Sequence, residues 1–488
     1  MSFQVESRSH RQPLMRPSWR WAALTVGAML LTACAHTPPP PQPDLSLPAP
    51  AAWTLAPLPH EAAAAPDRHW WSRWEDAVLL HLQAQAVRVS PTLAAAATRM
   101  ARARHEWTMA DAAAGPTVQG VAAWQRGVAQ PGLPASTTVS AGVQASWEID
   151  LWGGLAAQQQ GARERAHASA ALSGAARVGL EAEVARQYTG WRICQQFTAL
   201  SQTDAQSRAT TARLTALQVQ AGLAPATASA LTEASAAQGR MQVTQQQARC
   251  DAALRGLSEL TGLDVAALQA QLKTDPTAAW DAARVPALQI PNALPATLLA
   301  QRPDVWAAQR AVLAASADVQ ATDADQRPRL SLSGQLMPVR SIGVGADATV
   351  WSIGPVQLSV PLWDGGRRQS ASAVSRVAYD EALSSYRASV RTAVREVESA
   401  LIELHSIRQR ETDAATATER LTQVLKATTE RQRAGLASVL ELEDVRRTAL
   451  NAQLSLIELA RDRAWAWIDL YRVLGGGWEA SNVSSITN

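Results

Sequence analysis

The chain has 488 residues, enough for several domains, and a formal net charge of +3 from 45 basic and 42 acidic residues. Residues 1–33 contain four Arg and one Glu, so this segment carries the whole excess and the remainder of the chain is neutral. Because positive and negative residues are interspersed, the chain lacks the basic surface that nucleic-acid binding requires. We therefore expect no nucleic-acid partner.

Residues 1–33 have the pattern of a signal peptide, in which Arg residues precede an apolar run that is too short to span a bilayer. The sequence LTAC follows and resembles a lipobox, whose cysteine, Cys34, would be acylated and become the mature N-terminus. An ordinary signal peptide with a chance cysteine is the alternative. Residues 34–66 are rich in proline and alanine and predict an extended, lipid-anchored tether. Ala35 in place of aspartate favours sorting to the outer membrane.

The rest of the chain contains an internal repeat whose matching features keep a nearly constant offset along the sequence. The repeat predicts a duplicated, domain-sized unit, over residues 67–263 and 295–477. A connecting segment, 264–294, lies between the two copies, and a tail, 478–488, follows them. The matching features are Pro91 and Pro303, Pro116 and Pro328, DLWGG (150–154) and PLWDGG (361–366), AGL at 221 and 434, and LTGL (260–263) and LGGG (474–477).

Each repeat predicts one helix, two strands, and then two long helices separated by the AGL turn. The first helices are expected at about 91–114 and 303–326, where a proline opens each pattern. Apolar residues occupy every odd position from Val139 to Leu151, which is the period of a strand. The parity changes at Gly354-Pro355 and predicts a bulge. The four strands are expected at about 117–126, 138–151, 329–338 and 348–363.

Strands of ten or more residues suit a membrane barrel, with one face in lipid and the other in a polar lumen. Four strands cannot close such a barrel, so this interpretation requires several chains. The alternative is a soluble sandwich with buried tryptophans. The tryptophans that would form the aromatic girdle are Trp124, Trp147, Trp152, Trp351 and Trp363.

Residues 154–220 and 367–433 contain no proline, so each predicts a helix of roughly 100 Å at 1.5 Å per residue. Apolar residues at seven-residue spacing, for example Val390, Val397 and Leu404, predict coiled-coil packing. Such long helices are rare in soluble globules and fit a tunnel through a periplasm.

Cys194 and Cys250 lie at equal distances along the sequence on either side of Gly222. In an antiparallel hairpin that turns at Gly222, the two side chains face each other, and we expect a disulfide between them. Two buried free thiols are the alternative. The second repeat has Ile407 and Arg463 at the equivalent positions, so this link is not part of the shared plan.

Taken together, the lipobox, the duplicated units, the LW-(D)-GG segments, the AGL turns and the terminal YRVLGGGW resemble the outer-membrane efflux factors of the TolC, OprM and NodT type. The resemblance covers nearly the whole chain. It implies a fold that is mainly α with membrane β: a long coiled-coil helical barrel, plus four strands per chain that complete a twelve-stranded β-barrel in a homotrimer. It also implies an outer-membrane, lipid-anchored duct of a tripartite efflux pump that extends into the periplasm. A periplasmic adaptor (membrane fusion) protein and an inner-membrane pump of the resistance-nodulation-division type would be its partners.

In that family the AGL turns are periplasmic tips. The resemblance implies that the tips at Gly222, Leu223, Gly435 and Leu436 dock the adaptor; a local contact that closes the turn is the alternative for the two leucines. Leu440, Asp444 and Arg447 share one helix face only in the second repeat and match the family's periplasmic gate. The alternative is a solvated ion pair on a helix exterior. Glu441 and Glu443 are expected on other faces, as solvent contacts.

We find no nucleophile with a base, no phosphate-binding motif and no metal-ligand spacing among the eight histidines. We therefore expect no enzyme activity and no cofactor. Drugs or other small toxic molecules are the expected cargo. The alternatives are an exit duct for type I protein secretion or metal export, or a lipid-anchored periplasmic coiled-coil scaffold without a pore.

Overall fold

The computed structural model describes residues 45, 50, 53, 54, 69–128, 135–273, 299–342 and 347–480. The signal peptide, Cys34, most of the tether, residues 274–294 of the connecting segment and residues 481–488 of the tail fall outside these residues. The elements are η1 (Trp70–Trp74), α2 (Ala77–Val89), α3 (Pro91–Ala113), β1 (Thr117–Gly127), β2 (Ser136–Ile149), α4 (Gly154–Gln220), α5 (Ala226–Thr261), α6 (Val265–Lys273), α8 (Pro303–Ala324), β3 (Arg329–Ile342), β4 (Asp347–Ser359), α9 (Arg367–Arg433) and α10 (Val439–Val473).

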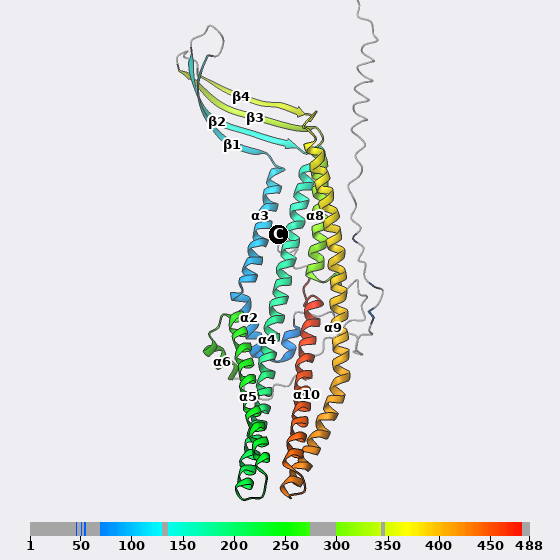
Figure 1. The fold of residues 1–488 in the computed structure, drawn as a ribbon. Helices are drawn as coiled ribbons and strands as arrows, with labels where there is room; N and C mark the ends of the chain where they lie inside the picture. The colour runs from blue at the N-terminus through cyan, green and yellow to red at the C-terminus, as the bar shows by residue number, and fades with distance from the viewer. Residues whose placement is uncertain are drawn as a thin grey trace, which may run out of the picture. The chain divides into compact units, whose positions relative to one another are not determined.

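The described elements belong to two compact units, and the helices α3, α4, α8 and α9 contribute residues to both. In the first unit the four strands form one antiparallel sheet in the order β1-β2-β3-β4 (Figure 1). The strands are 11–14 residues long, as the sequence predicts. β2 and β4 end earlier than expected, at Ile149 and Ser359, because the backbone leaves the sheet before the LW-(D)-GG segments.

The predicted bulge lies in β4. Val356 pairs with Leu332 and Ile353 pairs with Gly334, so two residues of β4, Gly354 and Pro355, face a single residue of β3. Proline cannot donate a hydrogen bond to the neighbouring strand, and a bulge is where a strand tolerates it.

The LW-(D)-GG segments start the two long helices in the first unit. Asp150 accepts a hydrogen bond from the backbone N–H of Ala156. In the second repeat Asp364 accepts from the N–H groups of Gly366 and Arg368. A carboxylate at the start of a helix accepts hydrogen bonds from backbone N–H groups that have no partner within the helix. Its negative charge also interacts favourably with the positive end of the helix dipole. Each repeat therefore uses an aspartate to turn a strand into a helix of 67 residues.

The second unit holds the main hydrophobic core. The predicted heptad residues Val397 and Leu404 are buried in it, together with Tyr471 of α10. The core also contains a tryptophan cluster that the sequence did not lead us to expect: Trp70 stacks on Tyr471, and Trp71 and Trp74 pack beside it. This cluster fixes the short helix η1 against α10.

The start of α2 is tied to α4 by a hydrogen bond. Asp76 caps α2 by accepting from the N–H of Leu79, and it also accepts from the hydroxyl of Tyr188 at 2.7 Å. Burial, and then the charge of Asp76, raise the pKa of the Tyr188 phenol well above its usual range. The phenol therefore stays protonated and donates to the carboxylate.

None of the described helices combines the length and the apolar run that crossing a membrane demands.

Candidate functional site: the two helical tips

Both AGL turns end a long helix with the same hydrogen bonds. Leu223 N–H donates to the carbonyl of Gln218 at 2.8 Å, and Gly222 N–H donates to Val219 at 2.9 Å. Leu436 and Gly435 repeat this pattern in the second hairpin. This is a Schellman motif, which needs a left-handed residue, and both glycines have φ near +74°.

The two tip leucines are exposed rather than packed into the turns. Leu223 is 80% exposed and Leu436 is 71% exposed. A local contact that closes the turn is therefore not what this chain shows. Each side chain leaves an apolar surface at a hairpin end, where a helix of another protein can cover it.

Only the second tip is braced by charges. Ser438 caps α10 by accepting from the N–H of Glu441, and the Glu441 carboxylate binds Arg431 of α9 at 2.8 Å. Arg431 also donates to the carbonyl of Leu436 at 3.1 Å. At the equivalent places the first tip has Gln218 and Ala228, which carry no charge. Glu441, one of the charged residues after the second AGL, therefore stabilises the turn through Arg431.

The predicted gate residues lie on one exposed face of α10. Leu440 is 62% exposed, and Asp444 and Arg447 form an ion pair within the chain with about two thirds of each side chain exposed. An ion pair this accessible contributes only about 0–1 kcal/mol to stability. Because this ion pair is weak, it can break or change partners at little cost in free energy.

The position of Glu443 differs from the expectation given above. We expected a solvent contact, but the residue is 7% exposed. Its carboxylate accepts from the hydroxyl of Ser235 on α5 at 2.6 Å and forms an ion pair with Arg446, one turn further along α10. The periodicity of α10 alone could not show this, because it does not say which polar face another helix covers.

Glu443 belongs to a buried polar network that joins the two hairpins. Arg208 of α4 binds Asp204 at 2.6 Å, donates to Ser235 at 2.7 Å and lies 3.9 Å from Glu443. The side chains of Arg208, Asp204, Glu443 and Arg446 are each less than a tenth exposed. Two acids and two bases balance within the network, which reduces the cost of burying the charges.

A signal for this network was present in the sequence. Arg208 and Ser235 lie at nearly equal distances along the chain from Gly222, so they face each other by the same reasoning that pairs the two cysteines. Gly239 leaves room for the arginine, because a Cβ there would lie 3.1 Å from the Cδ of Arg208.

Higher in the first hairpin, Cys194 and Cys250 are joined by a disulfide, with Cα atoms 5.5 Å apart. The equivalent residues of the second hairpin differ in kind: Ile407 is buried in the core and Arg463 binds Glu411 at 3.3 Å. The first hairpin is thus covalently closed and the second is not.

Among the described residues, no group of three or more His, Cys, Asp or Glu side chains is placed to hold a metal ion. Cys34, the predicted acylation site, lies outside the described residues.

The described residues of each repeat supply one long helical hairpin and two strands of the sheet, so the chain is built from a duplicated unit. The sequence model for outer membrane efflux proteins matches residues 82–263 and 294–476, one segment in each repeat. The chain belongs to this outer membrane efflux protein family, and it is an outer-membrane exit channel of an efflux system.

Named relatives match over nearly their whole length. The chain is 30% identical to the pyoverdine export outer membrane protein OpmQ of Pseudomonas putida, over 93% of this chain and 97% of that one. It is 28% identical to the outer membrane protein OprJ of Pseudomonas aeruginosa, over 96% and 97%. It is 24% identical to the cation efflux system protein CusC of Escherichia coli, over 93% and 97%.

Solved structures show the same fold. The outer-membrane channel OprN superposes with a TM-score of 0.78 at 26% identity, over 89% of this chain and 99% of that one. The CmeC outer membrane channel of Campylobacter jejuni superposes with a TM-score of 0.80 at 19% identity, over 93% and 98%.

Proposed function

We propose that the chain forms a passive, homotrimeric duct that is closed at its periplasmic tips and opened there by an adaptor protein. Three chains would supply twelve strands in the outer membrane and a helical tunnel below them. Cys34 would carry the lipid anchor. The duct would serve a tripartite pump whose energy comes from an inner-membrane transporter of the resistance-nodulation-division type.

The observation that best supports the proposed gate is the difference in exposure between two faces of α10. Leu440, Asp444 and Arg447 lie exposed on one face, while Glu443 and Arg446 lie buried on another, against α4 and α5. In a ring of three chains, the exposed face repeats three times around one constriction. The leucines would then form an apolar ring and the ion pairs a polar one.

The buried network gives this gate a resting position. It holds α10 against the first hairpin, and the disulfide keeps α4 and α5 of that hairpin in register. We propose that the first hairpin is the fixed part and that the second hairpin moves when the duct opens. A docked adaptor then shifts the equilibrium by binding the open arrangement more tightly.

A groove beside the first tip, lined by both polar and apolar residues, supports adaptor docking. It has a volume of about 410 Å³ and lies between the ends of α4 and α9. Leu214, Leu217 and Leu223 line it, and all three are more than half exposed. A helix from the adaptor would bury these leucines as helices do in apolar grooves.

We propose small molecules as the cargo. Two of the relatives named above carry names that state a cargo, pyoverdine and cations, and both are small. Solvent and toluene efflux proteins of Pseudomonas putida, each 25% identical over 70% of this chain, add two further small cargoes. These names do not single out one compound, as expected for a passive duct behind a selective pump.

The test of the duct is whether the purified protein conducts. Size measurement by light scattering should give three chains per particle, and insertion into a planar lipid bilayer should give discrete current steps. A well-folded, lipid-bound protein that gives neither trimers nor current would leave the anchored scaffold as the function.

A further inference from the structure

A groove beside the disulfide brings side chains of α4, α5 and α10 together. Its volume is about 510 Å³, and the residues that line it all belong to the second unit. Ile193, Cys194 and Phe197 of α4 give it a buried apolar surface. Arg249 of α5 and Glu458 of α10 are exposed and line it from the two other helices. The groove therefore combines an apolar surface with a cation and an anion that come from different helices.

Arg249 and Glu458 are the unpaired charges of this groove in the part of the chain that the structure describes. Neither side chain makes a hydrogen bond or an ion pair there, and the two do not pair with each other. The other three charged side chains of the lining are bound within the chain: Arg186 to Asp469, Arg461 to Asp462 and Glu183 to Gln187. Two opposite charges thus remain available to a ligand.

Trp465 of α10 is held in place in the same groove. Its indole N–H donates to the carbonyl of Arg186 and to the hydroxyl of Thr189, both at 3.2 Å. The guanidinium carbons of Arg186 and Arg461 lie 4.7 Å and 4.9 Å from the centroid of its ring. These hydrogen bonds and cation–π contacts fix Trp465 before a ligand binds, and small-molecule sites are usually preformed in this way.

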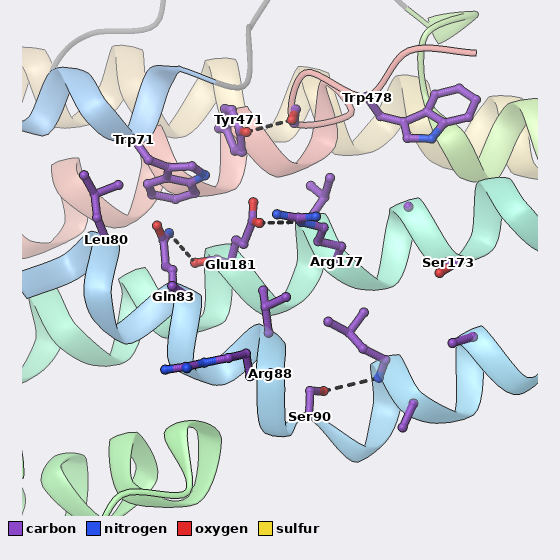
Figure 2. A pocket seen from close by; sticks show the side chains of 18 of the residues that line it. Trp71, Leu80, Gln83, Arg88, Ser90, Ser173, Arg177, Glu181, Tyr471 and Trp478 are labelled. Atoms are coloured by element: carbon purple, nitrogen blue, oxygen red, sulfur yellow. Dashed lines mark hydrogen bonds and ion pairs between the residues drawn. The ribbon is translucent and has the colours of Figure 1, made fainter. Parts of the chain in front are cut away.

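A larger groove in the same unit offers no such pair of charges. It has a volume of about 1250 Å³ and lies among η1, α2, α3 and α4 (Figure 2). Figure 2 shows that Arg177 binds Glu181, at 2.8 Å, and that Gln83 donates to the carbonyl of Glu181. The described lining contains no other acid, so Arg88 has no opposite charge across this groove. Two unpaired opposite charges therefore distinguish the smaller groove from the larger one.

We propose that the groove between α4, α5 and α10 binds a zwitterion with an apolar body, such as a short peptide with an aromatic side chain. Arg249 binds the carboxylate, and Glu458 accepts hydrogen bonds from the ammonium group. The apolar body covers Ile193 and Phe197. The inference goes beyond the proposed duct and does not rest on it, because a single chain supplies all of these residues.

The test is isothermal titration calorimetry of the dipeptide alanyl-phenylalanine into the full-length protein in detergent. Two capped forms of the same dipeptide are the ligand controls: the N-acetyl form lacks the ammonium, and the C-terminal amide lacks the carboxylate. We expect saturable binding of the free dipeptide. Each capped form should bind at least about fivefold more weakly, because it loses one hydrogen-bonded ion pair.

Substitutions in the walls of the groove should match the changes in the ligand. Arg249→Gln and Glu458→Gln should each weaken binding of the free dipeptide at least about fivefold. Glu458→Gln should leave binding of the N-acetyl form unchanged, because the ammonium that Glu458 binds is already absent. The matched control Arg255→Gln removes an exposed arginine of α5 that does not line the groove, and it should leave binding unchanged.

Each outcome decides the proposal. Binding that follows this pattern supports it. An N-acetyl form that binds as tightly as the free dipeptide would overturn the zwitterion, because the groove would then select an organic anion. No saturable binding to the folded wild type, or equal losses in Arg249→Gln and Arg255→Gln, would overturn the site itself. All of these results are independent of whether the protein conducts, so they leave the test of the duct separate.

Discussion

Replacing Glu443 by glutamine should separate the buried network from the exposed ion pair beside it. The substitution removes one of two buried acids while leaving an amide oxygen that still accepts from Ser235. Arg446 then relies on the hydroxyl of Thr211, at 3.1 Å, for a hydrogen bond to another helix. Breaking a buried pair by removing one partner costs about 3–5 kcal/mol, and the retained hydrogen bond places this variant near 3 kcal/mol.

The matched control is Asp444→Asn, the same change one residue later. Asp444 is 65% exposed and its partner Arg447 63%, so the loss should be below about 1 kcal/mol. Guanidinium denaturation followed by helical circular dichroism compares the two variants in the same detergent. Equal losses in the free energy of unfolding would refute the buried network as an anchor of α10.

The network also gives an expectation for gating. If α10 leaves the first hairpin when the duct opens, a loss of about 3 kcal/mol per chain raises the ratio of open to closed arrangements of each hairpin about a hundredfold, since each 1.4 kcal/mol is tenfold. Glu443→Gln should then conduct far more often than the wild type. A variant that is less stable but equally closed would show that the network holds the fold and does not hold the gate.

Three further expectations concern the tips, the disulfide and the ion pair between Glu164 and Arg310. Gly435→Ala should lower the free energy of unfolding by about 1–2 kcal/mol, because φ is +74° and strain in the backbone is the only cost where nothing crowds the added Cβ. The control Gly179→Ala, within α4, should raise the free energy of unfolding by up to about 1 kcal/mol. Equal effects of the two substitutions would contradict the left-handed turn. Replacing Cys194 and Cys250 by serine should cost about 4 kcal/mol, because the disulfide closes a loop with a sequence separation of 56; an unchanged denaturation midpoint would contradict the covalent closure. Burial raises the pKa of Glu164, but its hydrogen bonds and the charge of its arginine partner lower it overall, below the ordinary 4.5. The ionised carboxylate of Glu164 therefore stabilises the fold above about pH 4.5, and this contribution is lost as the pH falls through the lowered pKa. The difference in melting temperature between the wild type and Glu164→Gln should be constant near pH 7 and shrink below about pH 4.5. A difference that does not change with pH would contradict a lowered pKa for Glu164.

Much of the fold could be predicted because its signals are local. The period of two identified the strands, and the absence of proline over 67 residues identified α4 and α9. Equal spacing from Gly222 paired Cys194 with Cys250, and the structure places Arg208 and Ser235 by the same rule.

The parts that the sequence did not reveal depend on which face a distant helix covers. Glu443 and Asp444 are adjacent acids on one helix, yet one is buried and the other exposed, because α4 and α5 lie on only one side of α10. The tryptophan cluster around Trp70 was missed for the same reason, since Trp70 belongs to the first described helix and its partner Tyr471 to the last. The period of the apolar residues predicts that a segment is a helix, but the neighbouring helices determine which of its polar and aromatic side chains are buried.

The exposed face of α10 that carries Leu440, Asp444 and Arg447 is proposed to close a conducting tunnel. The most direct test is single-channel conductance in a planar bilayer, with the wild type beside the double variant Asp444→Ala/Arg447→Ala. A small wild-type conductance that rises clearly in the variant is the predicted result, because the exposed ion pair would no longer hold the constriction. Equal conductance in the two proteins would contradict the gate at this face while leaving the channel in place.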